Sequence, residues 1–342
     1  MVKKFCCPNC FSDYFLKEHI PAVSNKEGKC SFCNSLNVVL IDPEFLFDRF
    51  EPLLELYEAD SKGNKISELI QSDWNVFSFA SGTKQNNLLK AITKTNYDTK
   101  SKFKPKYLQD RTNIEQWEKF REELKHSNRF FPNAAPSRDQ LNPFGKYIGS
   151  SIKSGAQVFY RARINNSDNP HPIKKMGKPP EKEVGNGRAN PNGIPYLYVS
   201  STIDTAISEV RGHKGEELTV AEFHLKSNIK LADLREPKNK ISPFLLNDEE
   251  NELELIYKNM PFLTLLGNEL SKPIIPREAN LEYLPSQYLC ELVKHMGFNG
   301  IIFKSSISDG NNYVIFSDKK LKAMKTFQYH ITDTSVSAER ID

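Results

Sequence analysis

The sequence predicts an α+β protein made of three parts. Five of the six cysteines lie in the first 33 residues, and four of them form two Cys-x-x-Cys pairs. Apolar residues then recur at helical spacing as far as residue 126, and from Val158 the period changes to two, which is typical of strands. We therefore expect a metal-binding knuckle region at residues 1–40, a helical N-terminal domain at 41–150 and a mixed β-sheet domain at 151–342.

The composition excludes several classes of protein. A hydrophobic fraction of 38% is that of a soluble globular chain, and a net charge of +4 does not by itself imply binding to nucleic acid or membranes. No apolar run approaches the roughly 20 residues of a membrane span. The first residues, Met-Val-Lys-Lys-Phe, lack the apolar core of a signal peptide. We expect a cytoplasmic protein.

The paired cysteines predict a zinc site. Cys7-Pro-Asn-Cys10 and Cys30-Ser-Phe-Cys33 each turn two thiolates to one side of a tight loop, so together they can form a tetrahedral S4 site. Four protein ligands leave no open position, which favours a structural Zn²⁺ worth on the order of 10 kcal/mol to folding. Cys6 could take the place of Cys7, and scattered reduced thiols are the alternative.

Helices are expected between the knuckles and the sheet. Asp42 is a predicted N-cap followed by Pro43, and apolar residues from Phe45 to Tyr57 have helical spacing. Further helices are expected around 65–70, 86–95 and 112–126.

Two features of this region suggest contact with nucleic acid. The lysine-rich stretch 84–107 contains Tyr97 and Phe103 and could follow a phosphate backbone, although a solvated helix face is the more common explanation. The spacing Arg121-x-x-x-x-His126 resembles the active pair of HEPN-type ribonucleases, although so short a pattern also arises by chance.

The C-terminal part predicts strands at 158–164, 194–200, 219–225, 229–234, 300–303, 313–316 and 324–331. A helix at 286–296 should end at Gly297, and the apolar stretch 261–276 fits either a helix or extended chain.

Arginines and a glycine-rich loop suggest an anion site. Arg161 and Arg163 share one face of a predicted strand, and Arg188 lies within the loop Gly185-Asn-Gly-Arg-Ala-Asn-Pro-Asn-Gly193. Fixed guanidinium groups and close backbone N–H groups suit a pyrophosphate. Surface ion pairs and an ordinary loop are the alternatives.

Other polar groups follow at strand and helix ends. Tyr198 could stack on a flat heterocycle, and Ser201 with Asp204 resembles a capping box at the start of the helix that carries Glu209. Hydroxyl and amide groups also lie at predicted strand ends, in Ser305, Ser306 and Asn312. Such groups are typical both of turns and of ligand sites.

The order of these blocks resembles the RES family, named after an Arg, a Glu and a Ser. The blocks are Phe-Tyr-Arg at 159–161, the glycine loop with Leu-Tyr at 197–198, Ala-Ile-x-Glu-Val at 206–210, and Phe-Lys-Ser-Ser followed by Asn-Tyr-Val-Ile-Phe at 303–316. The stretches Met176–Pro180, Tyr283–Gln287 and Gly297–Gly300 also resemble the family, and the resemblance covers roughly residues 152–330. The N-terminal part resembles the zinc-knuckle helical extension, loosely classed as HEPN/RES N-terminal, found on some of these proteins.

The resemblance implies an ADP-ribosyltransferase-like fold that binds NAD and cleaves its nicotinamide–ribose bond. Family members act as NAD-depleting toxins, by phosphorolysis or hydrolysis, or transfer ADP-ribose to a protein. The catalytic positions fall on Arg161, Tyr198, Glu209 and Ser305, and the NAD-binding positions on Arg163, Arg188, Asn190, Gly193, Ser306 and Asn312.

The expected partners are NAD and inorganic phosphate, together with an antitoxin or an inhibitory N-terminal domain. A protein that binds nucleic acid or cleaves RNA through its N-terminal domain is the alternative. The sequence leaves open whether the chain forms a homo-oligomer.

Overall fold

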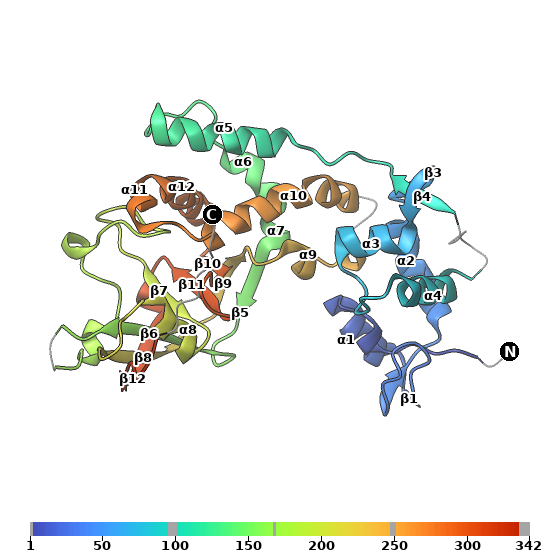
Figure 1. Cartoon of the computed structure of the whole chain (residues 1–342), viewed down its shortest axis with the longest axis horizontal. Coiled ribbons are helices and arrows are strands. Elements are labelled where there is room, and N and C mark those ends of the chain that lie inside the picture. The colour runs from blue at the N-terminus through green and yellow to red at the C-terminus, as the bar shows by residue number, and fades with distance from the viewer. Residues whose placement is uncertain (1–2, 95–100, 167–168, 247–250, 335–342) are drawn as a thin grey trace, which may run out of the picture. The chain divides into compact units, whose positions relative to one another are not determined.

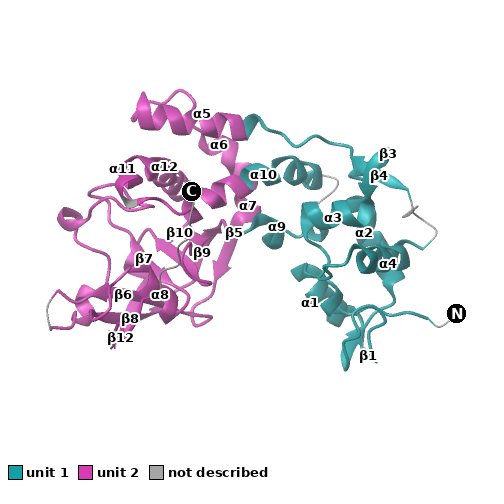
Figure 2. Ribbon diagram, viewed as in Figure 1, with its two compact units in different colours: residues 1–113, 236–263 teal, residues 114–235, 264–342 magenta. Residues whose placement is uncertain are grey.

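The computed structural model describes residues 3–94, 101–166, 169–246 and 251–334, and the chain divides into two compact units (Figure 1, Figure 2). Unit 1 consists of residues 1–113 and 236–263, and unit 2 of residues 114–235 and 264–342. The second segment of unit 1 therefore comes from the C-terminal half of the sequence. Each of the three predicted domains is continuous in sequence, whereas unit 1 is made of two separate segments. The predicted domain boundaries therefore stay a prediction.

Unit 1 is mainly helical. Asp42 caps the first turn as predicted, because its side chain accepts a hydrogen bond from the backbone N–H of Glu44 at 3.3 Å and Pro43 begins a 3₁₀ turn before α2 (Phe47–Leu54). The other helices are α1 (Tyr14–Val23), α3 (Ile66–Trp74), α4 (Gly82–Thr93), α9 (Pro237–Lys240) and the first part of α10 (Glu252–Ser271), and β1 (Lys26–Gly28) pairs with β2 (Val38–Leu40). The stretch after Pro261 that could not be assigned from the sequence is thus helical as far as Ser271.

Two strands of unit 1 lie where only helices were predicted. β3 (Tyr57–Lys65) pairs antiparallel with β4 (Lys102–Pro105), within the domain that we expected to be helical. Gly63 allows the close approach, since a Cβ atom there would lie 2.0 Å from the carbonyl oxygen of Phe103. The pairing is irregular between Ala59 and Asn64, which explains why no clean alternation is visible in the sequence.

The core of unit 1 joins its two chain segments. The ring of Phe244 lies 4.9 Å from that of Phe50, and the ring of Tyr257 lies 6.3 Å from that of Trp74. All four side chains are buried or nearly so, with Phe244 the most exposed at 8%. Residues 236–263 are therefore part of the core of unit 1, and these aromatic contacts stabilise it.

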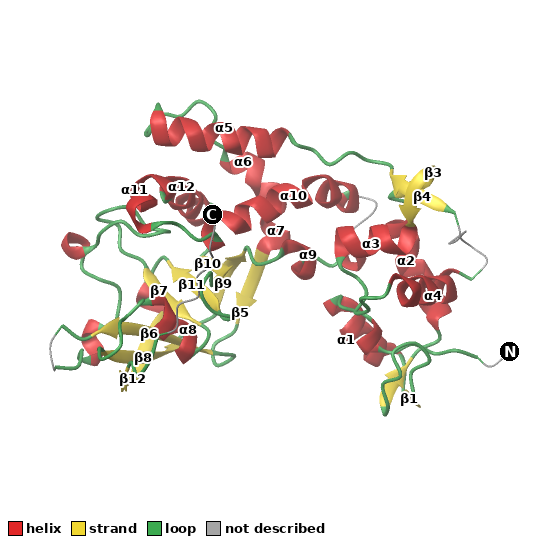
Figure 3. Ribbon diagram, viewed as in Figure 1, coloured by secondary structure: helices red, strands yellow, loops and turns green. Residues whose placement is uncertain are grey.

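Unit 2 contains an eight-stranded mixed sheet in the order β12-β8-β6-β7-β11-β10-β9-β5 (Figure 3). The strands are β5 (Gly149–Ile152), β6 (Val158–Ile164), β7 (Leu197–Ser200), β8 (Glu217–Leu225), β9 (Ile229–Asp233), β10 (Gly300–Lys304), β11 (Asn311–Ile315) and β12 (Leu321–His330). Only β9 and β10 pair in parallel within this sheet. The predicted α+β class with a C-terminal mixed sheet is confirmed.

The sheet is divided at one point. β6 pairs with β8 along all seven of its residues, from Val158 to Ile164, but with β7 only through Tyr160 and Ser200. Beyond that single pair the two strands are not joined by ladder hydrogen bonds. Open space between two strands is where side chains can enclose a ligand.

Helices surround this sheet within unit 2. Ala206 of α8 (Ile203–Glu209) packs with Ala162, Leu218 and Val220 of the sheet. The remaining helices are α5 (Thr112–His126), whose first two residues belong to unit 1, α6 (Arg138–Leu141), α7 (Gly145–Ile148), α11 (Ala279–Glu282) and α12 (Leu284–His295). Gly297 follows α12 with φ +90°, as expected for a glycine C-cap. Every helix in the described ranges is too short or too polar to cross a membrane.

Candidate functional site

A cavity of about 370 Å³ opens where β6 and β7 separate. Its lining includes Arg161 from β6 and Tyr198 from β7, together with Glu209 at the end of α8. Of the predicted site residues, Arg188, Ser306 and Asn312 also line it. Residues as far apart in the sequence as Arg161 and Asn312 thus line the same cavity.

Glu209 is held in place by two donors. Its Oε1 atom accepts hydrogen bonds from Ser305 Oγ at 2.7 Å and from Asn312 Nδ2 at 2.6 Å. Among the residues that the structure describes, none donates a hydrogen bond to the second carboxylate oxygen, Oε2. The carboxylate is therefore fixed by one oxygen, and the other can meet a ligand.

The helix that carries Glu209 begins differently from the prediction. Its N-cap is Thr202, whose hydroxyl accepts a hydrogen bond from the backbone N–H of Thr205 at 3.1 Å, so the predicted capping box of Ser201 and Asp204 is wrong. Threonine competes as an N-cap with the neighbouring serine, and sequence alone does not decide between adjacent hydroxyls.

Ser305 contacts Glu209 and does not line the cavity. Its hydroxyl donates to Glu209 and accepts from the backbone N–H groups of Ile307 and Ser308, both at 3.2 Å. One donor and two acceptor positions are all that a hydroxyl offers. Ser305 therefore orients the carboxylate and ties the loop after β10, while its neighbour Ser306 faces the cavity.

The two arginines of β6 have different surroundings. Arg161 lines the cavity and its Nη1 atom donates to the carbonyl of Gly177 at 2.5 Å. Burial lowers the pKa of Arg161 to about 10, with repulsion from Arg163 as the next cause, so its side chain keeps a positive charge at neutral pH. Arg163 donates to the carbonyl of Lys175 at 2.7 Å and is not among the described residues that line the cavity.

Arg188 forms part of another wall. Its Nη1 atom donates to the carbonyl of Lys272 at 2.7 Å, and its guanidinium lies 5.6 Å from the ring centroid of Tyr283. Burial lowers the pKa of Arg188, while the nearby charge of Glu209 acts in the opposite direction. Sequence reasoning gave no role to Tyr283, Leu270 or Arg211, which also line the cavity.

The glycine-rich loop is held by a network of hydrogen bonds. The Tyr198 hydroxyl donates to Asn190 Oδ1 at 2.7 Å and accepts from the backbone N–H of Ala189 at 3.0 Å, and burial raises the pKa of this tyrosine. Gln287 Nε2 donates to the carbonyls of Gly187 and Asn190 at 2.9 and 3.1 Å. Asn190 therefore supports the loop and, like Gly193 with its φ of +80°, lies outside the described cavity lining.

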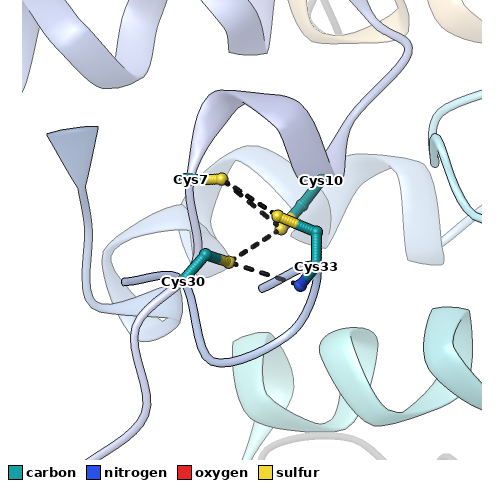
Figure 4. Close-up of side chains that lie close together, drawn as sticks. All are labelled: Cys7, Cys10, Cys30 and Cys33. Carbon is teal, nitrogen blue, oxygen red and sulfur yellow. Dashed lines mark hydrogen bonds between the residues drawn. The ribbon is translucent and has the colours of Figure 1, made fainter. Parts of the chain in front are cut away.

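The four predicted cysteine ligands meet in unit 1 (Figure 4). The Sγ atoms of Cys7, Cys10, Cys30 and Cys33 all lie within 4.8 Å of one another, and the Cys7–Cys33 and Cys10–Cys30 pairs are 3.4 Å apart. A tetrahedral zinc site with Zn–S bonds of about 2.3 Å has sulfurs about 3.8 Å apart, so the cluster fits that ion. Cys6 is not part of the cluster, which resolves the ambiguity with Cys7.

The Arg121–His126 pair does not meet at one site. Arg121 Nε lies 3.3 Å from Glu269 Oε1, whereas the exposed His126 lies 3.9 Å from Glu122. Neither is among the described residues of the cavity between β6 and β7. The two side chains therefore have different partners.

The lysine-rich stretch is partly paired. Lys104 contacts Glu58 and Asp60 at 3.3 Å each, and Lys94 contacts Glu44. Tyr97 and Lys100, which also belong to the predicted stretch, lie outside the described residues.

Comparisons with known proteins assign a family to the C-terminal part. The crystal structure of the M. tuberculosis MbcT–MbcA toxin–antitoxin complex contains a chain that matches 56% of this chain and 91% of its own length, with 10% identity and a TM-score of 0.32. A search of curated proteins found no match. The model of the RES domain matches residues 159–334, slightly more than half of the 342 residues. The chain therefore belongs to the RES domain family.

Proposed function

We propose that this protein is an NAD-degrading enzyme that cleaves the nicotinamide–ribose bond, by phosphorolysis or hydrolysis, and acts as a toxin or defence effector. The observation that carries the proposal is the fixed Glu209 carboxylate, which shares one cavity with the guanidinium groups of Arg161 and Arg188. The carboxylate suits the positive charge that develops on the ribose of NAD, and the two guanidinium groups suit the negative charge of its pyrophosphate.

Glu209 is proposed to stabilise the transition state. When the C1′–N bond breaks, nicotinamide leaves with the electron pair, and the ribose carbon takes on oxocarbenium character. A carboxylate that is already oriented by Ser305 and Asn312 loses little energy to reorganisation as that charge develops. Its Oε2 atom can also accept a hydrogen bond from a ribose hydroxyl.

The arginines are proposed to hold the pyrophosphate. A guanidinium has five N–H donors, and the hydrogen bonds described for Arg161 and Arg188 use only the Nη1 atom of each. The remaining donors can bind phosphate oxygens in pairs. Arg163 is not among the described residues that line this space, and we assign it no contact with NAD.

Tyr198 is proposed to line the nicotinamide end of the cavity with its ring. Its hydroxyl already holds Ala189 and Asn190, so the ring rather than the hydroxyl is free to contact the ligand. Ser306 and Asn312 would complete the polar lining near Glu209.

The cysteine cluster is proposed to hold a structural Zn²⁺. Four thiolates would fill its coordination sphere and hold the loops around β1 and β2 together, so the ion would take no part in the reaction. If the protein degrades NAD in the cell that makes it, a neutralising antitoxin or another regulatory protein is also expected.

The test is to incubate the purified full chain with NAD, with and without inorganic phosphate, and to identify the products by mass spectrometry. Phosphorolysis joins a phosphate oxygen to C1′ and yields nicotinamide and ADP-ribose 1″-phosphate. Hydrolysis joins a water oxygen, releases a proton and yields ADP-ribose. Absence of nicotinamide release under both conditions would refute the proposal, and label from NAD on a protein of a cell lysate would redirect it to ADP-ribosyl transfer.

A further inference from the structure

One wall of the cavity comes from helices rather than from the sheet. Leu270 near the end of α10 and Tyr283 just after α11 line it, and both belong to unit 2. Arg188 rests over the Tyr283 ring and donates to the carbonyl of Lys272, so it joins the two segments. We refer to Leu270, Lys272 and Tyr283 as the helical wall.

A cluster of charges lies directly behind the helical wall. Glu269 precedes Leu270, and Glu282 precedes Tyr283, so each carboxylate is adjacent in sequence to a cavity residue. Three cations surround the two carboxylates: Arg121 and Lys125 from α5, and Lys272 from the wall itself.

Short distances connect the charged groups of this cluster. Arg121 bridges the two carboxylates, with Nε 3.3 Å from Glu269 Oε1 and Nη2 3.6 Å from Glu282 Oε2. Lys125 Nζ lies 2.6 Å from Glu282 Oε1, and Lys272 Nζ lies 3.3 Å from Glu269 Oε2. The Glu269 side chain is 2% exposed and that of Lys125 is 7% exposed, so water screens these charges much less than a surface pair.

The cluster is more than a set of surface ion pairs. If Arg121 is removed, Glu269 loses its contact with helix α5, and Lys272, whose Nζ lies 3.3 Å from Glu269 Oε2 and 3.5 Å from Glu282 Oε2, is left to join the two carboxylates. Of the cations in this cluster, only Lys272 would then join the segments that carry Leu270 and Tyr283, so we expect the two segments to be held less firmly. A displacement of about 1 Å at a binding site is enough to change affinity or rate by up to 100-fold.

We propose that Arg121 is a positioning residue of the NAD site: through Glu269 and Glu282 it fixes the helical wall, and with it Tyr283 and Arg188. Helix α5 thus belongs to the active unit although it precedes the part matched by the RES model, which begins at residue 159. The identity of the ligand as NAD rests on the proposed function. The role of Arg121 in fixing the helical wall does not depend on it. It also gives Arg121 a role that its spacing from His126 did not suggest.

The first test needs no substrate. Hydrogen–deuterium exchange of the full chain is compared for wild type, Arg121→Ala and His126→Ala, the last an exposed residue of the same helix as a matched control. We expect backbone exchange in residues 264–283 to become at least about 10-fold faster in Arg121→Ala and to be unchanged in His126→Ala. Unchanged exchange of this segment in a folded Arg121→Ala protein would overturn the proposal.

The second test uses NAD. We expect Arg121→Ala to raise KM for NAD about 10-fold with kcat changed by less than about 3-fold, because the wall contributes to binding rather than to the bond cleavage at Glu209. Arg121→Lys, which keeps one charge, should restore part of the affinity, and His126→Ala should behave as wild type. A fall in kcat with KM unchanged would contradict a positioning role.

A milder variant covers the case in which Arg121→Ala does not fold. Glu282→Gln keeps the size of a side chain that is 26% exposed and removes one charge of the cluster, so we expect faster exchange in 264–283 and a KM about 3-fold above wild type. If this variant shows neither change, the proposal fails. If wild type neither binds nor consumes NAD while exchange in 264–283 still depends on Arg121, the proposed function fails and the role of Arg121 in fixing the wall stands.

Discussion

Replacing Glu209 with glutamine isolates the charge of the carboxylate from its shape. Glutamine has nearly the same volume, and its Oε1 atom can still accept the hydrogen bonds that Ser305 Oγ and Asn312 Nδ2 donate at 2.7 and 2.6 Å. The loop after β10 and the start of β11 should therefore keep their positions. What is lost is one negative charge in a cavity that three arginines, Arg161, Arg188 and Arg211, also line.

The expected effect falls on the rate rather than on binding. Removing one preorganised group that stabilises transition-state charge costs about 2.7–4 kcal/mol, which corresponds to roughly a 100- to 1000-fold lower kcat. The arginines that we assign to the pyrophosphate are unchanged, so KM should stay within about 3-fold of wild type. Their unopposed positive charge would further disfavour a ribose cation.

The assay is the initial rate of nicotinamide release over a range of NAD concentrations, with thermal unfolding recorded on the same samples. Asp204→Asn is the matched control, because it removes an exposed carboxylate from the same helix outside the described cavity lining. We expect its kinetics to equal those of wild type. A folded Glu209→Gln protein with wild-type kcat would refute the role of the carboxylate and, with it, the mechanism.

Three other changes test different parts of the molecule. Ser305→Ala should lower kcat about 10-fold, since it frees the carboxylate and leaves two backbone N–H groups unpaired; wild-type kinetics would show that the hydroxyl does not orient that carboxylate. Gly187→Ala should destabilise the fold by about 1–3 kcal/mol in thermal unfolding, because the new Cβ would lie 2.3 Å from Asn190 Oδ1. Gly185→Ala, where the nearest atom is 4.0 Å away, is its control, and equal melting temperatures of the two variants would contradict the argument. Elemental analysis should find about one zinc per chain in wild type and in Cys6→Ser but less in Cys7→Ser, and the absence of zinc from reduced wild-type protein would rule out the metal site.

Much of the fold could be predicted because its signals are local. The change of apolar period at Val158 indicated the sheet, and two Cys-x-x-Cys pairs indicated the cluster that brings Cys7 and Cys33 within 3.4 Å. The pairing of β3 with β4 could not be predicted, since its strands are separated in sequence by two helices and joined with an irregular register. Long-range pairing of that kind leaves no periodic trace.

The candidate site was predicted only where local sequence blocks carry its residues. Arg161, Tyr198 and Glu209 lie at block positions of the family and do converge, but the alternation that placed Arg163 beside Arg161 could not show where β6 and β7 separate. The stretch Tyr283–Gln287 resembles the family, but the role of Tyr283 as a cavity residue was not predicted, because it depends on the packing of α10 and α11.

The discontinuity of unit 1 has a consequence for how the protein is made. Its first 113 residues leave the ribosome well before residues 236–263, which bring Phe244 and Tyr257. At synthesis rates of about 5–20 residues per second, the 150 residues from 113 to 263 take roughly 8 to 30 s. The cysteine-bearing segment must therefore wait, with part of its apolar surface uncovered, until residue 263 has been translated.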